Sequence, residues 1–393
     1  MVAACPFPHP RGTPIRILRM AEALAERGHE IHVVTYHLGA GDANAAFCIH
    51  RTRELSSYRH VAPGPTYKKL LLLDPLLTAK LVEVIGRFSI DVVHAHHYEG
   101  LLVSAGARLF ARPPGRLKAR LPVVYDAHTL LSSELSFYGL GLPAAVKDAI
   151  GRRLDRWLPR RADHVISVTN AIRTSLVVDG VVPSDVVTVI PNGVECERFA
   201  AGAVARAGSR NGARKVLFTG NLASYQGINS LLEAFAEVVR TRNDVRLTIA
   251  ADSPFAPYED RARELGVRHA IDVVPAPAFE CLPTLLASAD VAVNPRGQCA
   301  GMPVKLLNYM AASRPVVSFV GSAPGLEHRR TGWLVENGDI AAFARGIVTL
   351  LDDHQLAADL GRGARRYVEA HHGWPAAAKQ IDEVYRKVLG AAP

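Results

Sequence analysis

The sequence has few of the features that mark secreted or membrane-spanning proteins. Its five cysteines form no Cys-x-x-Cys pair and their number is odd, so we expect neither a disulfide scaffold nor a zinc knuckle. No run of about 18 apolar residues occurs, since the leucine run at 70–73 stops at Asp74 and Pro75. The first six residues are too short for a signal-peptide core. These absences predict a cytoplasmic protein, either soluble or peripheral at the inner face of a membrane.

Two familiar nucleotide-binding signatures are also missing. The absence of a Gly-x-Gly-x-x-Gly loop argues against a dinucleotide-dependent oxidoreductase, and there is no Gly-Lys-Ser/Thr P-loop. Aromatic residues make up only 7 % and do not interleave with the arginine clusters, which argues against a nucleic-acid partner. The 46 Lys and Arg residues still exceed the 37 Asp and Glu residues, for a net charge of +9. A phosphate-bearing ligand or an anionic surface fits that charge.

Short runs rich in Val and Ile alternate with segments of helical period along most of the chain. Such runs suit the buried strands of a parallel sheet. With about five residues before the loop at Pro6, the first strand is expected to look clipped. We predict an α/β protein of two doubly wound, Rossmann-like domains that face each other across a cleft. The predicted divisions are a first domain at 1–198, a linker without period at 199–214, a second domain at 215–372 and a final helix at 373–393.

Ligands of such folds bind where the strands end, so the loops after the strands are the candidate sites. The first of these loops contains Gly12, which lets a ligand approach the backbone, and Thr13, which can cap the helix that carries Arg16. The free N–H groups of a helix start attract anions. The alternative is a plain strand-to-helix turn.

A second candidate loop runs from Gly220 to Gly227. Its backbone amides could hold a diphosphate, and the side chains of Asn221 and Gln226 could donate hydrogen bonds to it. A structural turn explains the same spacing equally well.

The stretch at 294–311 is the most informative. Pro303 suits the first position of a helix, which leaves the preceding turn facing an anion. Lys305 and Asn308 are three residues apart and share a helix face. The alternative is a surface lysine and an asparagine that interrupts a buried helix. The predicted binders of diphosphate and ribose in this stretch are Gly301, Met302, Lys305 and Asn308.

Histidines follow two strands of the first domain. His94, His96 and His97 end one strand, and Asp126 and His128 end another. No Glu or Asp stands at a spacing from these histidines that is typical of a metal site, so we expect no metal ion. Two histidine-bearing loops at one sheet edge suit sugar recognition and proton transfer. Two nearby glutamates, Glu99 and Glu134, are expected to be solvated.

Together these loops resemble those of the family-4 retaining glycosyltransferases, which have the two-domain GT-B fold. The resemblance covers nearly the whole chain, and its motifs come in the family's order. They are Val189-Ile-Pro-Asn-Gly-Val194, Phe218-Thr-Gly-Asn-Leu222 with Gly227-Ile228, Ala289-Asp290-Val291 with Pro295, Met310-Ala311 with Arg314-Pro315, and Thr331-Gly332 with Val335.

The resemblance implies transfer of a sugar from a nucleotide-sugar to a glycan or lipid-linked acceptor with retained configuration, in cell-surface polysaccharide or glycolipid synthesis. It implies no metal or other cofactor. The second domain would bind the donor, the first the acceptor, and the final helix would cross back to the first domain. The implied donor-binding residues are Gly12, Thr13, Arg16, Gly220, Asn221, Gln226, Arg296, Gly301, Met302, Lys305 and Asn308. His128 and Lys305 are the implied catalytic residues, and His96, His97 and Asp126 lie on the acceptor side.

Four positions depart from the family. Its usual Arg and Lys in the second-domain loop, and its two Glu near the donor, correspond here to four neutral residues: Asn221, Gln226, Ala300 and Asn308. Neutral groups lose the strength of charge-assisted hydrogen bonds. We expect Lys305 to supply the missing cation, as in a Gly-x-Pro-x-Lys subgroup, with Arg16 and Arg296 as further candidates. The alternatives are a non-catalytic nucleotide-sugar-binding homologue or partner subunit, and a sugar-nucleotide epimerase.

The positive charge is concentrated in residues 105–161, which hold 11 basic and 4 acidic residues. Part of this segment resembles an interfacial membrane helix, with Val146, Ile150 and Trp157 on or near the face opposite the charges. The alternative is a solvated face whose apolar side lies in the domain core. The arginines predicted to contact an anionic membrane are Arg152, Arg153, Arg156, Arg160 and Arg161.

Overall fold

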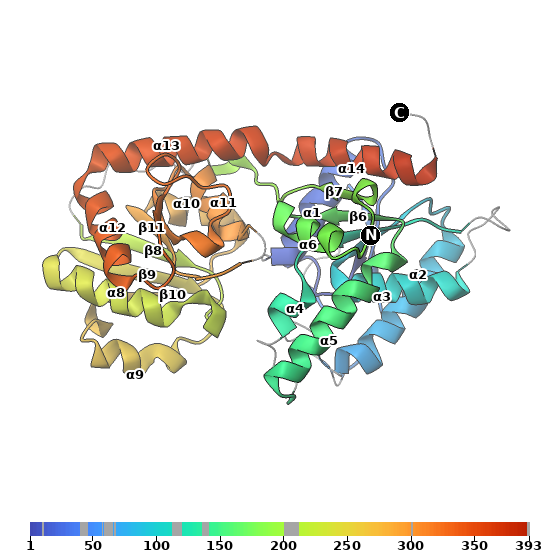
Figure 1. The fold of residues 1–393 in the computed structure, drawn as a ribbon, viewed down its shortest axis with the longest axis horizontal. Helices are drawn as coiled ribbons and strands as arrows, with labels where there is room; N and C mark the ends of the chain where they lie inside the picture. Colours follow the sequence, from blue (N-terminus) through green and yellow to red (C-terminus); the bar gives the residue numbers. More distant parts are fainter. Residues whose placement is uncertain are drawn as a thin grey trace. The chain divides into compact units, whose positions relative to one another are not determined.

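The chain divides into two compact units, which are described separately (Figure 1). Unit 1 comprises Met1–Asn192 and Trp374–Pro393, and unit 2 comprises Gly193–Gly373. The computed structural model describes residues 1–9, 12–39, 46–56, 58, 66, 68–111, 120–135, 141–199, 212–299 and 302–390. Most of the predicted linker at 199–214 lies outside these residues.

Unit 1 is built on a seven-stranded parallel sheet with the order β3-β2-β1-β4-β5-β6-β7. The strands are β1 (Val2–Ala3), β2 (His32–Thr35), β3 (Cys48–Arg51), β4 (Val93–His96), β5 (Val123–Ala127), β6 (His164–Ser167) and β7 (Val187–Val189). The β-branched residues of the central strands are buried on both faces, as parallel strands between two helical layers require.

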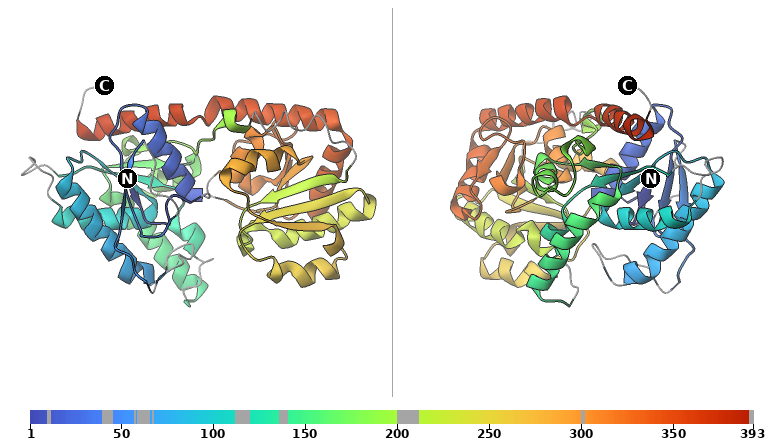
Figure 2. Two further views of the ribbon diagram at one scale, coloured as in Figure 1. Left: turned by 180° about the vertical axis from the view of Figure 1, so that it is seen from behind. Right: turned by 45° about the vertical axis from the view of Figure 1, so that its right-hand side comes forward.

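The helices of unit 1 cover both faces of this sheet. They are α1 (Gly12–Ala25), α2 (Asp74–Arg87), α3 (His97–Phe110), α4 (Leu131–Glu134), α5 (Ala144–Trp157), α6 (Asn170–Val178) and α14 (Trp374–Leu389), with a π-helical turn η1 (Lys69–Leu73) before α2 and short 3-10 turns η3 (Pro159–Arg161) and η4 (Ser184–Val186). Helices α2, α3 and α5 lie side by side on one face (Figure 1). Helix α1 lies on the other face, with α14 against it (Figure 2).

The last helix belongs to the core of unit 1. Ile381 is fully buried and packs with Leu24 and Met20 of α1. The hydroxyl of Tyr385 lies 2.7 Å from Nδ1 of His94 in β4. These contacts join the end of the chain to the first third of the sequence.

Unit 2 has a six-stranded parallel sheet with the order β10-β9-β8-β11-β12-β13. The strands are β8 (Arg214–Thr219), β9 (Val245–Ala251), β10 (Ile271–Pro275), β11 (Val291–Asn294), β12 (Val316–Phe319) and β13 (Trp333–Val335). The helices are α8 (Ile228–Thr241), α9 (Ala256–Glu264), α10 (Leu282–Ala287), α11 (Val304–Ala311), α12 (Ile340–Asp352) and α13 (His354–His371). Short 3-10 turns complete the unit: η6 (Ser224–Gln226), η7 (Arg268–Ala270), η8 (Phe279–Cys281) and η9 (Val320–Ser322).

Two apolar layers sandwich the sheet of unit 2. One joins the strands to α8, α9 and α12, and the other joins them to α10, α11 and α13. The predicted fold class, two Rossmann-like parallel α/β domains, is therefore confirmed. Within the described parts of the chain, no helix is long and apolar enough to cross a bilayer.

The burial of Ile381 predicts how strongly α14 stabilises unit 1. Ile381→Ala should lower the free energy of unfolding by roughly 2–5 kcal/mol, because it removes apolar contacts and leaves a cavity. Urea unfolding followed by circular dichroism measures the change. Lys379→Ala, an exposed position on the same helix, is the control and should leave the midpoint nearly unchanged. Equal midpoints for both variants would contradict this packing.

Candidate functional site

A buried ion pair joins three loops at the carboxyl ends of the unit 1 strands. Arg16 of α1 and Asp126 of β5 are 1 % and 0 % exposed, and their paired atoms are 2.8 and 3.0 Å apart. The remaining N–H groups of Arg16 donate to the carbonyls of Ile190 and Pro191 and to the side chain of Asn192, at 3.0 to 3.1 Å. All five guanidinium N–H groups are thus used inside the unit.

Asp126 also gathers the histidines that end β4 and β5. Its Oδ2 lies 3.2 Å from Nδ1 of His96 and 3.4 Å from Nε2 of His128. The other ring nitrogen of His128 lies 3.3 Å from Oγ1 of Thr13. The ring of His97 is 5.8 Å from that of His128. The structure therefore brings the predicted residues of both strand ends and the first loop into one cluster.

Burial decides the charge state of this cluster. It lowers the pKa of His96 to about 4 and the pKa values of His94 and His97 well below 6.5. Burial alone would raise the pKa of Asp126, but Arg16 and His128 beside it hold that pKa well below its usual range. The three histidines are therefore neutral near pH 7 and the carboxylate is ionised.

His97 has an unusual backbone. Its φ is 64° at the first position of α3, in the left-handed region that a side chain with a Cβ rarely adopts. This conformation places the histidine at the junction of β4 and α3, where sheet folds bind ligands.

One group of side chains in the described chain has the geometry of a metal site. Candidate ligand atoms of His94, His96 and Asp126 lie within 4.8 Å of one another. However, Arg16 already binds both oxygens of the carboxylate, and Nδ1 of His94 contacts the Tyr385 hydroxyl. A guanidinium in this position competes with a divalent cation, so this donor set does not fit a metal ion.

Unit 1 contains a second polar cluster that the sequence did not predict. The ammonium of Lys69 lies 2.6 Å from Oε1 of Glu99, and the two residues are 3 % and 8 % exposed. The prediction that Glu99 is solvated was wrong. Its partner is 30 residues away on a segment with no recognisable motif, so only the tertiary fold pairs them.

In unit 2, the ammonium of Lys305 reaches the loop after β8. It donates a hydrogen bond to Oε1 of Gln226 at 2.6 Å and lies 4.2 Å from the ring centre of Phe218. The amide of Gln226 in turn donates to Oδ1 of Asn221 at 3.3 Å. Three predicted site residues, two from the loop after β8 and one from helix α11, thus form one hydrogen-bonded chain. Burial, with Arg296 as the next cause, lowers the pKa of Lys305 to about 7.

The loop after β8 also touches the loop after β11 through its backbone. Gly227 has φ of 73°, and a Cβ there would lie 2.1 Å from the carbonyl oxygen of Pro295. Only glycine allows this approach. Arg296 stacks on Tyr225 at 4.7 Å. Gly220 also has a positive φ, of 132°, at the end of β8.

Two buried polar residues that the motifs did not reveal hold this region in place. Asn294, fully buried at the end of β11, donates to the hydroxyls of Ser318 and Ser322 at 2.9 and 2.8 Å. The hydroxyl of Tyr309 accepts from the backbone N–H of Thr219 at 2.8 Å and so ties α11 to β8. Their apolar neighbours in the sequence made both residues look like ordinary core positions.

The remaining predicted residues are placed as follows. Gly12, with φ of 47°, begins α1. Met302, which precedes α11, is buried, and Asn308, on α11, is half-buried. Gly301 and Ala300 lie outside the described residues. The candidate residues thus form two groups, one in each unit.

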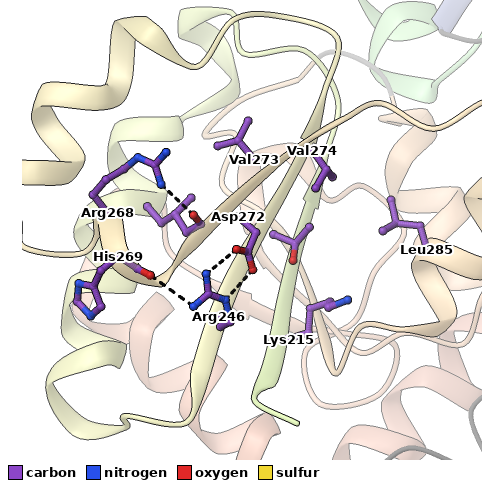
Figure 3. Close-up of a pocket in the computed structure, with 10 residues that line it drawn as sticks. Lys215, Arg246, Arg268, His269, Asp272, Val273, Val274 and Leu285 are labelled. Atoms are coloured by element: carbon purple, nitrogen blue, oxygen red, sulfur yellow. Dashed lines mark hydrogen bonds and ion pairs between the residues drawn. The ribbon is translucent and has the colours of Figure 1, made fainter.

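A hollow of about 660 Å³ opens elsewhere in unit 2, beside the edge strand β10 (Figure 3). Lys215, Arg246 and Asp272 line it from the amino ends of their strands, at the edge opposite the Lys305 cluster. Arg246 and Asp272 form a two-point ion pair at 2.5 and 2.7 Å, as the dashed lines show (Figure 3). This pairing offers a ligand little unbalanced charge.

The geometry agrees with two family models. The model described as Glycosyltransferase Family 4 matches residues 10–198, and that of Glycosyl transferases group 1 matches residues 213–353. The chain belongs to glycosyltransferase family 4. It is a retaining glycosyltransferase that uses a nucleotide-sugar donor.

The chain is also similar to full-length relatives. It is 26 % identical to an uncharacterized glycosyltransferase of Methanocaldococcus jannaschii, over 95 % of this chain and 94 % of that one. It is 26 % identical to the D-inositol 3-phosphate glycosyltransferase of Thermobispora bispora, over 96 % and 90 %. The sulfoquinovosyl transferase of Arabidopsis thaliana is 25 % identical, over 97 % and 71 %.

Solved structures show the same GT-B fold. Sucrose-phosphate synthase of Thermosynechococcus elongatus superposes with a TM-score of 0.80 at 20 % identity, covering 99 % of this chain and 96 % of that one. HepE of Anabaena, in complex with UDP and glucose, has a TM-score of 0.71 at 19 % identity, covering 97 % of each chain.

The buried histidines of this glycosyltransferase predict a pH-dependent stability. Between pH 6.5 and about pH 4, His96 is protonated in the unfolded chain but neutral in the folded one. The free energy of unfolding therefore decreases as the pH is lowered through this window. Each such histidine contributes a slope of roughly 1.4 kcal/mol per pH unit. Urea unfolding at a series of pH values should show a smaller slope for His96→Gln than for His269→Gln, which alters an exposed histidine of unit 2. Identical slopes would contradict the neutral buried state.

Proposed function

We propose that this glycosyltransferase transfers a sugar from a UDP-sugar to a glycan or lipid-linked acceptor at an anionic membrane surface, in cell-surface polysaccharide or glycolipid synthesis. In this proposal unit 2 binds the donor, and unit 1 binds the acceptor at the carboxyl ends of its strands. The complex of HepE with UDP and glucose supports uridine as the first base to test.

The contact between Lys305 and Gln226 is the main support for a donor site in unit 2. The family commonly has a lysine where Gln226 stands, and the ammonium of Lys305 lies 2.6 Å from that side chain. A positive charge is therefore available close to the position of the family's usual lysine, although it comes from α11 and not from the loop after β8. This relocation supports a functional variant of the donor site over a degenerate one.

The proposed reaction is a same-face substitution. The bond between the anomeric carbon and the diphosphate oxygen breaks, a bond to the acceptor oxygen forms, and the acceptor proton passes to the leaving diphosphate. Lys305 and the amides after β8 stabilise the charge that develops on the diphosphate. Position 300 is alanine, which leaves no carboxylate there for a double displacement.

His128 is the proposed contact nearest the reacting sugar. Its contacts with Thr13 and Asp126 orient the ring, and Arg16 keeps Asp126 ionised and in place. We propose Arg16 as a positioning residue, because its N–H groups are all used inside unit 1. We propose no metal or other cofactor, since Lys305 supplies a cation for the diphosphate.

A charge swap tests the donor site. Lys305→Gln should weaken UDP binding roughly tenfold to hundredfold, because it removes a charge-assisted hydrogen bond. Adding Gln226→Lys to that variant should restore much of the loss, since it returns the charge to the same place. Titration calorimetry with UDP, and release of UDP from UDP-sugars, measure both effects.

Lys215→Gln is the matched control, because it removes an ammonium from the opposite edge of the same sheet. It should leave UDP binding unchanged. If Lys305→Gln bound UDP like the unaltered enzyme, the proposed donor site would be wrong. If the swapped double variant stayed as weak as Lys305→Gln, the relocation of the charge would be wrong.

The proposed membrane contact rests on α5. Gly151 is the one described residue of this helix that is buried, and Val146, Ile150 and Trp157 are 43 %, 39 % and 44 % exposed. Their spacing puts all three on one stripe of the helix. Arg161 stacks on Trp157 at 4.3 Å. An exposed apolar stripe flanked by arginines favours an interfacial helix over one whose apolar side fills the core.

Vesicle binding tests this contact. Arg152→Gln with Arg156→Gln should weaken binding to anionic vesicles roughly tenfold or more at low salt, since each basic residue near the surface contributes about 1 kcal/mol. Co-sedimentation with phosphatidylglycerol vesicles at rising salt measures it. Arg330→Gln with Arg362→Gln, two exposed arginines of unit 2, should have no effect. Equal losses in both double variants would show that the net charge matters and the α5 face does not.

A further inference from the structure

One side chain of α14 reaches the histidine cluster of unit 1. Tyr385 is 8 % exposed, and its hydroxyl lies 2.7 Å from Nδ1 of His94, which is 1 % exposed. The two rings meet edge to face, with their centres 5.7 Å apart. The other ring nitrogen of His94, Nε2, lies 3.8 Å from Oδ2 of Asp126. His94 therefore stands between α14 and the carboxylate that gathers the other histidines.

Neither partner of this hydrogen bond carries a charge near pH 7. Burial raises the pKa of the Tyr385 phenol well above its usual value, and it lowers the pKa of His94 well below 6.5. The phenol is therefore protonated, and the imidazole carries one proton on one of its two nitrogens. The nitrogen that holds this proton decides what His94 presents to Asp126.

The surroundings of His94 favour the proton on Nε2. If Nδ1 carried it, the lone pair of Nε2 would face the ionised Asp126, and the Tyr385 hydroxyl would lose its acceptor. With the proton on Nε2, the hydroxyl donates to Nδ1, and the ring N–H points toward the carboxylate. A separation of 3.8 Å is too long for a hydrogen bond, but the N–H dipole still stabilises a buried anion at that distance.

His94 also packs face to face on His96. Their ring centres are 4.4 Å apart, and their planes differ by 13°. Nδ1 of His96 and Nε2 of His128 lie 3.2 and 3.4 Å from Oδ2 of Asp126. Within the described part of unit 1, nitrogens of three imidazoles thus surround the same carboxylate oxygen. A change of the His94 tautomer alters the field at that oxygen and therefore the orientation of the other two rings.

We propose that Tyr385 is a positioning residue that fixes the tautomer of His94, so that its N–H faces Asp126. The carboxylate then holds the rings of His96 and His128 in one orientation at the strand ends. The inference rests on the proposed function for the reaction beside His128. It extends the site to α14, which packs on α1 (Figure 2) and brings in a hydroxyl from 291 residues away in the sequence.

Tyr385→Phe tests the proposal, because it removes the hydroxyl and keeps the ring. Long-range nitrogen–proton NMR spectra of the ligand-free enzyme, with isotope-labelled histidine, show which nitrogen of each ring carries the proton. In the unaltered enzyme His94 should carry it on Nε2, and its signals are identified by their loss in His94→Gln. In Tyr385→Phe the Nδ1 signal of His94 should shift, since its lone pair loses the donor. The ring signals of His128 should shift with it.

Arg27→Gln is the matched control, because it weakens the contact of α14 without altering the hydroxyl. Arg27 pairs with Asp382 of α14 at 2.8 Å, about one helical turn from Tyr385. This variant should leave the signals of His94 and His128 in place. Shifts as large as those in Tyr385→Phe would assign the effect to helix docking and overturn the proposal. A proton on Nδ1 of His94 in the unaltered enzyme would also overturn it, whatever the variants do.

The reaction gives a second readout. Tyr385→Phe should slow the release of UDP from UDP-glucose about tenfold at saturating donor, with water in place of the acceptor, because misoriented histidines cost transition-state contacts. The affinity for UDP, measured by titration calorimetry, should be unchanged, since the donor site lies in unit 2. Adding Tyr385→Phe to His94→Gln should cause no further loss, because the two residues act through one hydrogen bond.

The outcomes separate the positioning role from the proposed function. A rate equal to that of the unaltered enzyme in Tyr385→Phe, or additive losses in the double variant, would overturn the positioning role. If the unaltered enzyme bound UDP but released none from any UDP-sugar, the proposed function would fail. The NMR signals of the ligand-free enzyme would then decide the tautomer by themselves. Circular dichroism checks the fold of every variant.

Discussion

The ion pair between Arg16 and Asp126 organises unit 1. Both groups are withdrawn from water, and this desolvation is offset only because every N–H of the guanidinium finds an oxygen. The arginine ties α1 to β5 and to the carbonyls at 190 and 191. The carboxylate in turn orients His96 and His128. The geometry of the histidine cluster therefore depends on a charge pair whose N–H groups are all bonded within unit 1.

Among the described residues of unit 2, the candidate site contains a single ammonium beside neutral side chains, not a paired arginine and aspartate. The loop after β8 holds the neutral residues Asn221 and Gln226, and a lysine from α11 reaches across to Gln226. The close approach of Gly227 to Pro295 makes this reach possible, because it brings the two loops into backbone contact. Burial leaves the lysine with a pKa of about 7, so a bound anion would stabilise its charged form.

The exposed apolar residues follow the same division between the units. Most of the large ones lie in unit 1, on η1, α3 and α5, and few lie in unit 2. The basic excess of residues 105–161 lies in unit 1 as well. Exposed apolar residues and a basic excess thus occur in the same unit, although the arginines of α5 and η3 lie toward the start of β6 and the leucines of η1 toward the strand ends.

Local patterns in the sequence determined the fold class, the strand-end loops and the family, because strand runs, glycine turns and ordered motifs are all short-range features. They also placed Lys305 and Asn308 on one helix face. Only the tertiary structure decided the partners: Asp126 for Arg16, 110 residues away, Gln226 for Lys305, 79 residues away, and Lys69 for Glu99. It also decided which side of α5 and which leucines of η1 face solvent. A helical period shows that a face exists, but the packing of distant segments determines whether that face is buried.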